Sequence, residues 1–136
     1  MPKLRHIALA TNDPDKTAEF YKTAFDFKEV KKVSGDLAYG YFLSDGTLNI
    51  AILKFNKHDQ LGKGLDYVGL HHFGVVVEDA DEYIKKLESM GAECFMKFSK
   101  QERAQGNLEV KFRGPDDVVI DIAEQPWPGA EPLPKT

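Results

Sequence analysis

The feature that most constrains the fold of this chain is an internal repeat. The stretches HIALATNDPDKTAEFY and HHFGVVVEDADEYIKKL each begin with histidine in an apolar run, pass an acidic turn and continue with helical periodicity. The separation of His6 and His72 equals that of Asp13 and Asp79, 66 residues, and at an offset of about 72 the Asn49 of SDGTLNIAIL is matched with the Asp121 of GPDDVVIDIA. Two similar modules are the simplest account of this pattern.

The first module predicts the order β-α-β-β-β. Residues 4–10 alternate like a short strand. Asp13 is expected to cap a helix with Pro14 in its first turn. The apolar stripe of that helix is expected on Phe20, Tyr21 and Ala24. Strands are then predicted at 28–33, 38–43 and 48–55, separated by SGD and SDGT turns.

The second module repeats this order after a polar, glycine-containing linker. LHHFGVVVE predicts a strand. Asp79 is predicted to be the N-cap of the following helix, with Glu82 three residues later, and Gly91 is predicted to end that helix. The stripe of this helix is expected on Tyr83, Ile84, Leu87 and Met90. The stretches ECFMKF, NLEVKFR and VVIDIAE complete the module as strands. The tail holds four of the seven prolines and predicts an extended arm, laid across the body or a partner through Trp127.

These elements predict an α+β fold of two paired βαβββ modules that form a cupped, eight-stranded mixed sheet. The apolar sheet face of one module cannot be covered by that module alone, so pairing is a physical expectation. We expect a single domain over 1–136, with modules at 4–55 and 70–124, a linker at 56–69 and an extended tail at 125–136.

Composition narrows the class of partner. A net charge of -4 and a pI near 5.5, without a Lys/Arg block, argue against nucleic acid and favour a small-molecule substrate. The single cysteine, Cys94, excludes an intramolecular disulfide and is expected to be a buried or half-buried thiol. No stretch has the features of a secretory or membrane-spanning segment, so we expect no membrane association and a cytoplasmic location.

The two repeated histidines are the first candidate site residues. His6 shares its strand face with Ala8 and His72 shares its face with Gly74, and such small residues leave room for a ligand beside each imidazole. Asn49 and Asp121 are predicted to occupy matching places in the last strands of the two modules. If the modules pair, two imidazoles and one carboxylate converge in a set suited to a divalent metal with open positions.

Other polar side chains have competing interpretations. His71 is predicted to point to the opposite face from His72, as a structural residue or as one that supports a ligand residue, and His58 is predicted to be solvated in the linker. Glu109 and Lys111 alternate with apolar residues, so either one of them faces the cavity or, more simply, both form a solvent-facing pair. A further set of aromatic side chains is expected to fill core rather than wall a cavity: Tyr39, Tyr41 and Phe42.

Over about residues 4–124 these stretches resemble the vicinal oxygen chelate superfamily, which includes glyoxalase I, methylmalonyl-CoA epimerase, extradiol dioxygenases, and bleomycin and fosfomycin resistance proteins. HIALATNDPDKTAEFYKTAFDF resembles the opening of the first module. HHFGVVVEDADEYIKKLESMGAE with RGPDDVVIDIAE resembles the second, whose usual ending is Asp-Pro-x-Gly-x-x-x-Glu. The resemblance implies paired βαβββ modules and a divalent metal, namely Zn, Ni, Co, Mn or Fe.

By this resemblance the metal positions fall on four residues: His6, Asn49, His72 and Asp121. Asn49 departs from the Glu, Gln or His usual in glyoxalase I and the epimerase, and Asp121 is one methylene shorter than the usual Glu. Asp26 replaces the glycine usual after the first helix, where Asp can adopt a left-handed conformation at modest cost. Members of this size commonly build their site at a two-fold interface, which implies a homodimer.

Three functions follow as hypotheses. The first is a glyoxalase-like lyase or isomerase that acts on vicinal oxygens through an enediolate-type intermediate, with Asp121 or Glu109 as the base. The second is an Fe(II) extradiol-type dioxygenase with His6, His72 and Asp121 as ligands. The third is a metal-free protein that binds a small molecule such as a drug, an interpretation that the two retained histidines disfavour.

Overall fold

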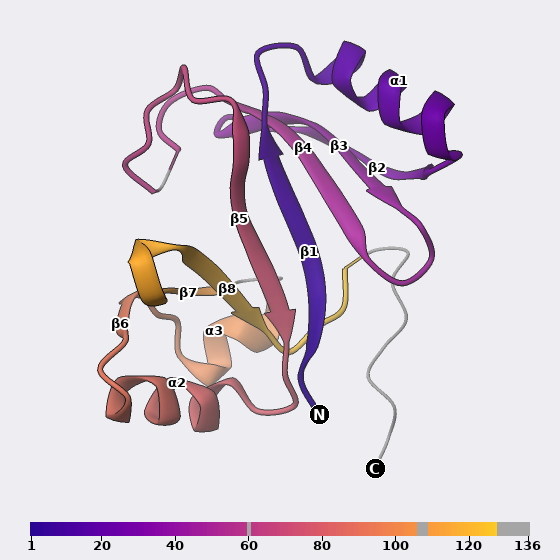
Figure 1. Cartoon of the computed structure of the whole chain (residues 1–136). Coiled ribbons are helices and arrows are strands. Elements are labelled where there is room, and N and C mark those ends of the chain that lie inside the picture. Colours follow the sequence, from indigo (N-terminus) through magenta and orange to yellow (C-terminus); the bar gives the residue numbers. More distant parts are fainter. Residues whose placement is uncertain (60, 106–108, 128–136) are drawn as a thin grey trace. The chain divides into compact units, whose positions relative to one another are not determined.

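A computed structural model describes residues 1–59, 61–105 and 109–127 of the chain. Within these residues, eight strands in a mixed sheet and three α-helices confirm the predicted α+β class (Figure 1). The elements are β1 (Lys3–Ala10), α1 (Pro14–Phe25), β2 (Lys28–Ser34), β3 (Ala38–Ser44), β4 (Asn49–Phe55), β5 (Gly69–Val76), α2 (Ala80–Ser89), β6 (Glu93–Met96), α3 (Lys100–Gln105), β7 (Val110–Arg113), a 3-10 turn (Pro115–Asp117) and β8 (Val119–Ala123).

The described residues divide into two compact units. The N-terminal unit comprises His6–His71 together with Trp127, and the C-terminal unit comprises Met1–Arg5 and His72–Pro126. The strand order is β2-β3-β4-β1 in the first and β5-β8-β7-β6 in the second. The outer pairs of each unit are antiparallel, whereas β1 with β4 and β5 with β8 are parallel. The strand-helix-three-strand order of the sequence repeat therefore occurs twice, with α3 inserted between β6 and β7 of the second unit.

The ends of the two long helices form where the sequence predicts them. The Asp13 carboxylate accepts the backbone N–H of Lys16 at 3.0 Å, which satisfies one unpaired donor of the first turn. Asp79 does the same for Glu82 at 3.2 Å. After α1, Asp26 adopts the expected left-handed conformation with a φ of 58°.

The buried face of α1 is shifted from the predicted stripe. Phe20 is 62% exposed and Ala24 is exposed, so the expectation that these two residues anchor the stripe is wrong. Ala18 instead packs against Leu43 and Ile52, with Tyr21 beside them. The small Ala18 side chain lets the helix approach the sheet closely, and this close approach leaves Phe20 outside the contact.

The α2 stripe is correct except at its end. Ile84 joins the core of the C-terminal unit, and Tyr83 and Leu87 pack against that core. Met90 is 72% exposed, because it is the cap residue and Gly91 follows with a φ of 88°. The helix therefore ends before Met90 can turn inward.

One helix was not predicted from the sequence. In α3 the Ser99 hydroxyl accepts the N–H of Glu102 at 3.1 Å, and the Glu102 carboxylate accepts the N–H of Ser99 at 3.1 Å. This reciprocal capping box stabilises a start between the predicted strands ECFMKF and NLEVKFR. Residues 107 and 108 of the second of these predictions, like Gln60 of the linker and 128–136 of the tail, lie outside the described residues.

The linker contains a buried anchor. Asp59 is 5% exposed, and its carboxylate accepts the backbone N–H groups of Leu61, Gly62 and Lys63 at 3.2, 2.9 and 2.7 Å. Burial raises the pKa of Asp59, but these three donors and the nearby His71 outweigh burial and lower the pKa below its usual value.

Among the described helices, none is both long and apolar enough to span a bilayer.

Candidate functional site

The C-terminal unit contains five polar side chains that form a charged cluster, defined here as Arg5, His72, Glu109, Lys111 and Asp121. Strand register accounts for the positions of Asp121, Lys111 and His72. In the sheet, Asp121 is paired with Gly74 of β5 on one side and with Lys111 of β7 on the other. Paired residues project to the same face, and alternation places His72 on that face with Gly74. Asp121 is 0% exposed and Lys111 is 6% exposed, so their charges interact away from bulk water.

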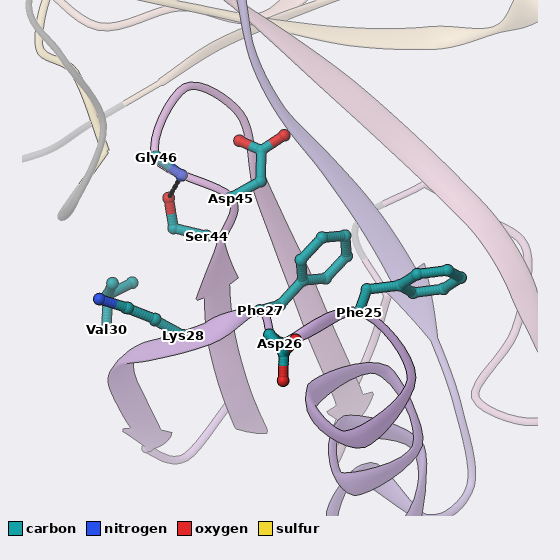
Figure 2. Close-up of a pocket in the computed structure, with 8 residues that line it drawn as sticks. All are labelled: Phe25, Asp26, Phe27, Lys28, Val30, Ser44, Asp45 and Gly46. Atoms are coloured by element: carbon teal, nitrogen blue, oxygen red, sulfur yellow. Dashed lines mark hydrogen bonds between the residues drawn. The ribbon is translucent and has the colours of Figure 1, made fainter.

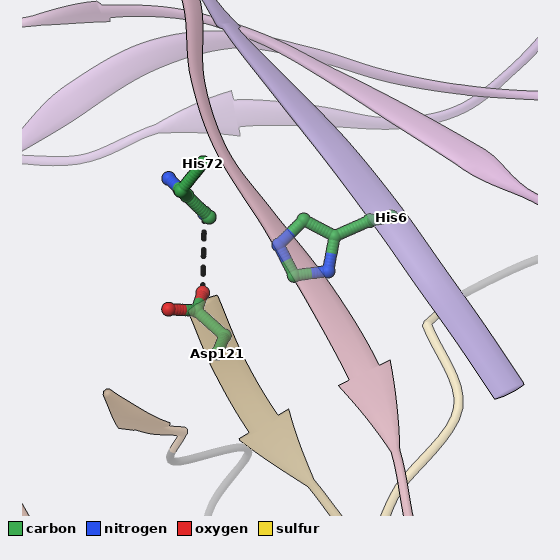
Figure 3. Close-up of side chains that lie close together, drawn as sticks. All are labelled: His6, His72 and Asp121. Carbon is green, nitrogen blue, oxygen red and sulfur yellow. Dashed lines mark ion pairs between the residues drawn. The ribbon is translucent and has the colours of Figure 1, made fainter. Parts of the chain in front are cut away.

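The Asp121 carboxylate is the centre of this cluster. The Lys111 ammonium donates to Asp121 Oδ1 at 2.7 Å, and His72 Nε2 lies 3.1 Å from Asp121 Oδ2 (Figure 3). Each carboxylate oxygen therefore faces a different partner. The lysine offsets the cost of burying the carboxylate, while the other oxygen stays beside an imidazole nitrogen.

Glu109 lies next to this pair and is held by two cations. Arg5 Nη1 donates to Glu109 Oε1 at 2.7 Å, and Lys111 Nζ lies 3.8 Å from Glu109 Oε2. Burial, followed by the negative charge of Asp121, raises the pKa of Glu109 to about 7 despite these cations. Burial also lowers the pKa of Arg5, partly offset by Glu109. A carboxyl group with a pKa near neutrality is suited to proton transfer.

These contacts decide between the two interpretations of Glu109 and Lys111. The simpler interpretation, a solvent-facing pair, is wrong, because Lys111 is buried and Glu109 is half-buried against Arg5. The buried Arg5 was missed by sequence reasoning. Its alternation within an apolar strand gave no signal for a partner more than a hundred residues away along the chain.

In the N-terminal unit, His6 has a different environment. His6 and Asn49 are paired in the β1–β4 register and both are 0% exposed. The indole of Trp127 stacks on the His6 imidazole, with ring centroids 4.1 Å apart and planes inclined by 13°. The predicted room over the small residues of this face is therefore occupied by Trp127, which packs on Ala8 and Ala51. From the sequence, Trp127 was expected only to contact either the body of the protein or a partner, without a specific neighbour.

The strand register corrects one predicted correspondence. Asn49 is paired with His6 itself, whereas Asp121 is paired with Gly74, two residues beyond His72. Asn49 and Asp121 therefore do not occupy matching places. The counterpart of Asp121 is Ala51, which is paired with Ala8, two residues beyond His6. The offset of 72 that matches Asn49 with Asp121 is two residues too large, because an offset of 70 places Ala51 on Asp121, as the register does. Alternation alone does not reveal such a shift, since it repeats every two residues.

Three other residues singled out from the sequence have environments of their own. His71 is 4% exposed, lies 3.7 Å from Asp59 and stacks on Phe55, in agreement with its predicted structural role. His58 is exposed, as expected. Cys94 is half-buried, also as expected, and burial raises the pKa of its thiol.

The N-terminal unit also has a surface hollow of about 310 Å³ (Figure 2). It is lined by Phe25, Asp26, Phe27, Lys28, Val30, Ser44, Asp45 and Gly46. Ser44 accepts the N–H of Gly46 at 2.9 Å, which ties one wall of the hollow into a turn. Its lining includes no predicted site residue.

Family comparison adds to this geometry. Residues 3–122 match the family model described as "Glyoxalase/Bleomycin resistance protein/Dioxygenase superfamily". The chain belongs to this superfamily. The resemblance read from the sequence is thereby confirmed, since the match spans both repeats. No protein with a curated description matches the sequence.

Solved structures agree on the fold. A methylmalonyl-CoA epimerase variant from Streptomyces coelicolor, in complex with 2-nitronate-propionyl-CoA, has a TM-score of 0.68 at 19% identity, covering 88% of this chain and 94% of that chain. A hypothetical protein, BH1468, from Bacillus halodurans C-125 has a TM-score of 0.72 at 19% identity, covering 91% and 94%. Methylmalonyl-CoA epimerase from Mycobacterium tuberculosis has a TM-score of 0.64 at 18% identity, covering 92% and 88%. At these identities the likeness establishes the fold alone.

Proposed function

We propose that this protein is a metal-dependent lyase or isomerase of glyoxalase type, acting on a small substrate with vicinal oxygens. His6, His72 and Asp121 are the proposed metal ligands. Each offers one ligand atom, an imidazole nitrogen or a carboxylate oxygen, and the set of two histidines and one carboxylate suits a divalent ion. The membership of the superfamily and the repeat of the histidines support this assignment.

The observation that carries the proposal is the contact of His72 with Asp121. Their facing atoms are 3.1 Å apart. Two ligand atoms bonded to one ion at about 2.0–2.1 Å lie roughly 2.8–3.4 Å apart at octahedral and tetrahedral angles. Lys111 engages the other oxygen of Asp121, so the oxygen facing His72 is the one that would bind an ion. The donor set therefore fits a divalent metal.

The proposed chemistry is transfer of a carbon-bound proton. A divalent ion supplies a Lewis acid that stabilises negative charge on the substrate oxygens. Glu109 is the proposed base: the C–H bond breaks, the proton goes to the Glu109 carboxylate, and the electron pair moves onto the substrate carbonyl. Return of the proton to carbon completes the reaction. Arg5 and Lys111 keep Glu109 in place through contacts of 2.7 and 3.8 Å.

Two predicted roles are kept as alternatives within this proposal. Asp121 is the second candidate base, acting if it leaves the metal. Asn49 is a candidate fourth ligand because it is paired with His6 and fully buried. Its short neutral amide is a weaker donor than a carboxylate. Comparing the metal affinity of Asn49→Ala with that of the unaltered protein tests this ligand.

The similar solved structures guide the choice of substrates. Two of them are epimerases named for methylmalonyl-CoA, and one of these contains 2-nitronate-propionyl-CoA. A first panel should therefore combine acyl-CoA thioesters with the glutathione hemithioacetal of methylglyoxal. Exchange of the substrate C–H for deuterium from D2O reports proton abstraction even where no net product forms.

The decisive experiment is elemental analysis of protein purified without a histidine tag. We expect about one divalent ion per chain, lost in His6→Ala, His72→Ala and Asp121→Asn. The exposed His58 gives a matched control, since His58→Ala should keep the metal. Glu109→Gln should keep the metal and lose deuterium exchange. Folded protein that binds no divalent metal would refute the proposal.

A ring-cleaving Fe(II) dioxygenase is the second candidate. The observation in its favour is that Ala51 occupies the position in the N-terminal unit that Asp121 occupies in the C-terminal unit. Only one of these two corresponding positions therefore carries a carboxylate. Two histidines and one carboxylate leave open positions for a catecholate and O2. Anaerobic loading with Fe(II), followed by oxygen uptake with a panel of catechols, separates this reaction from proton transfer.

The predicted homodimer and cytoplasmic location stay predictions. Light scattering coupled to size-exclusion chromatography tests the first directly. A mass of one chain of 15.3 kDa would contradict it.

A further inference from the structure

We propose that Trp127 is a positioning residue that fixes the plane of the His6 imidazole for metal binding. This inference rests on the proposed metal-binding function. It concerns the N-terminal unit alone, where the two rings are stacked at 4.1 Å with nearly parallel planes. Trp127 is 6% exposed and His6 is 0% exposed, so the stack is shielded from water on all but a small area.

The shape of this face favours an indole. Ala8 and Ala51 present only methyl groups beneath Trp127, and Phe42 contacts it with ring centroids 3.9 Å apart. Larger side chains at the two alanines would fill the space that the indole occupies. The aromatic wall and the flat floor therefore hold the indole in one orientation, and the indole in turn limits rotation of the imidazole.

The local sequence restrains Trp127 from the backbone side. It stands between Pro126 and Pro128. A residue that precedes proline is biased to an extended conformation, and proline itself has a nearly fixed φ. The backbone of Trp127 therefore loses little conformational entropy when the indole packs against His6. The contact can be maintained although Trp127 is not part of a helix or strand.

Stacking supports metal binding because of the direction in which imidazole binds metals. The lone pair of a ring nitrogen lies in the ring plane, so a metal approaches the edge of the ring and a stacked indole covers only a face. Metal-bound histidines are usually oriented by a neighbouring group, whose loss typically weakens metal affinity about 10- to 100-fold. In the N-terminal unit we assign this orienting role toward His6 to Trp127.

The test uses Co2+ with the full-length protein and three variants. Trp127→Leu retains apolar volume but removes the ring, and it should weaken Co2+ binding by about tenfold or more and alter the visible spectrum of the bound ion. Trp127→Phe restores a ring. Its affinity for Co2+ should stay within about threefold of that of the unaltered protein, and the visible spectrum of the bound ion should be unchanged. Phe55→Leu is the matched control, because Phe55 stacks on His71 rather than on His6. Its Co2+ binding should equal that of the unaltered protein.

Two further readouts do not depend on activity. Trp127 is the only tryptophan, so its fluorescence should be quenched as Co2+ binds beside it. In metal-free protein, the NMR signals of the His6 ring protons should carry an upfield ring-current shift that Trp127→Leu removes. Co2+ affinity and spectrum unchanged in Trp127→Leu would overturn the positioning role while leaving metal binding intact. Failure of the unaltered protein to bind Co2+ or any other divalent metal would overturn the proposed function and this role together.

Discussion

The two units share a backbone plan but differ in the chemistry of one corresponding pair. In the C-terminal unit Lys111 is paired with Asp121 across β7 and β8, and in the N-terminal unit Phe42 is paired with Ala51 across β3 and β4. Both pairs occupy the same register relative to the repeated histidine. One unit therefore places a buried ion pair where the other places an aromatic ring and a methyl group.

This difference shows how a duplicated module can diverge without changing its fold. Strand register and helix caps depend on the backbone and on a few capping side chains, which are alike in both halves. The face beside each histidine is free to vary, provided that it remains filled. In one half a salt bridge and Glu109 fill it, and in the other Trp127 fills it.

The largest expected effect comes from moving the charge to the apolar half. Ala51→Asp places a carboxylate beneath Trp127 without a cation across the strand pair. We expect the free energy of unfolding to fall by about 4–5 kcal/mol, because an unpaired buried charge is strongly destabilising. Urea denaturation measures this loss.

Adding Phe42→Lys to Ala51→Asp should recover part of that loss, since it recreates the Lys111–Asp121 pair in the other unit. A double-mutant cycle gives the coupling energy. A cost below about 1 kcal/mol for Ala51→Asp alone would show that this face is open to water rather than packed.

The second effect comes from breaking the charged pair itself. Asp121→Ala leaves Lys111 buried without its partner at 2.7 Å, and we expect a loss of about 3 kcal/mol in the free energy of unfolding. Asp121→Leu combined with Lys111→Met should restore most of the stability but none of the metal binding. If the double variant binds metal as the unaltered protein does, Asp121 is not a ligand.

A smaller effect is expected in the linker between the repeats. Asp59→Asn removes a buried charge that accepts three backbone N–H groups, at a cost of about 1–2 kcal/mol at pH 7. Because the folded-state pKa of Asp59 is lowered, its stabilisation is complete above the usual value of 3.8 and is lost as pH falls through the lower folded value. Urea unfolding of both proteins between about pH 7 and pH 2 should show the difference shrinking only below about pH 4. A difference that grows with acidity would contradict this assignment.

The smallest effect concerns α3, a helix that the described part of the N-terminal unit lacks. Ser99→Ala removes one half of the capping box and should cost about 0.5–1 kcal/mol. Protection of the α3 amides from hydrogen exchange should fall, while α2, capped independently by Asp79, should keep its protection. Equal loss in both helices would argue that α3 is not a separate local unit.

Much of the fold could be predicted because its signals are local. Asp13 and Asp79 mark helix starts through contacts three residues ahead, and strand alternation identifies which residues share a face with His6 or His72. The capping box at Ser99 was an equally local signal, and reading it would have found α3. Local geometry is repeated faithfully because each element depends on a few neighbouring residues.

Contacts between distant residues were less accessible. Phe20 belongs to the apolar pattern of α1 but is exposed, and Ala18 makes the contact between α1 and the sheet instead. The distance between helix and sheet decides which of these side chains is buried. The predicted match of Asn49 with Asp121 was wrong by two residues, because period-two alternation cannot distinguish such a shift.

The sequence by itself determined that the chain has two βαβββ modules and that the second histidine of HH, His72, shares a strand face with Gly74. The tertiary structure decided that Lys111 neutralises Asp121, that Arg5 holds Glu109, and that Trp127 covers His6. The reason is physical. Periodicity and capping operate within a few residues, whereas the partner of a buried charge or ring is set by strand register and by the packing of segments far apart along the chain.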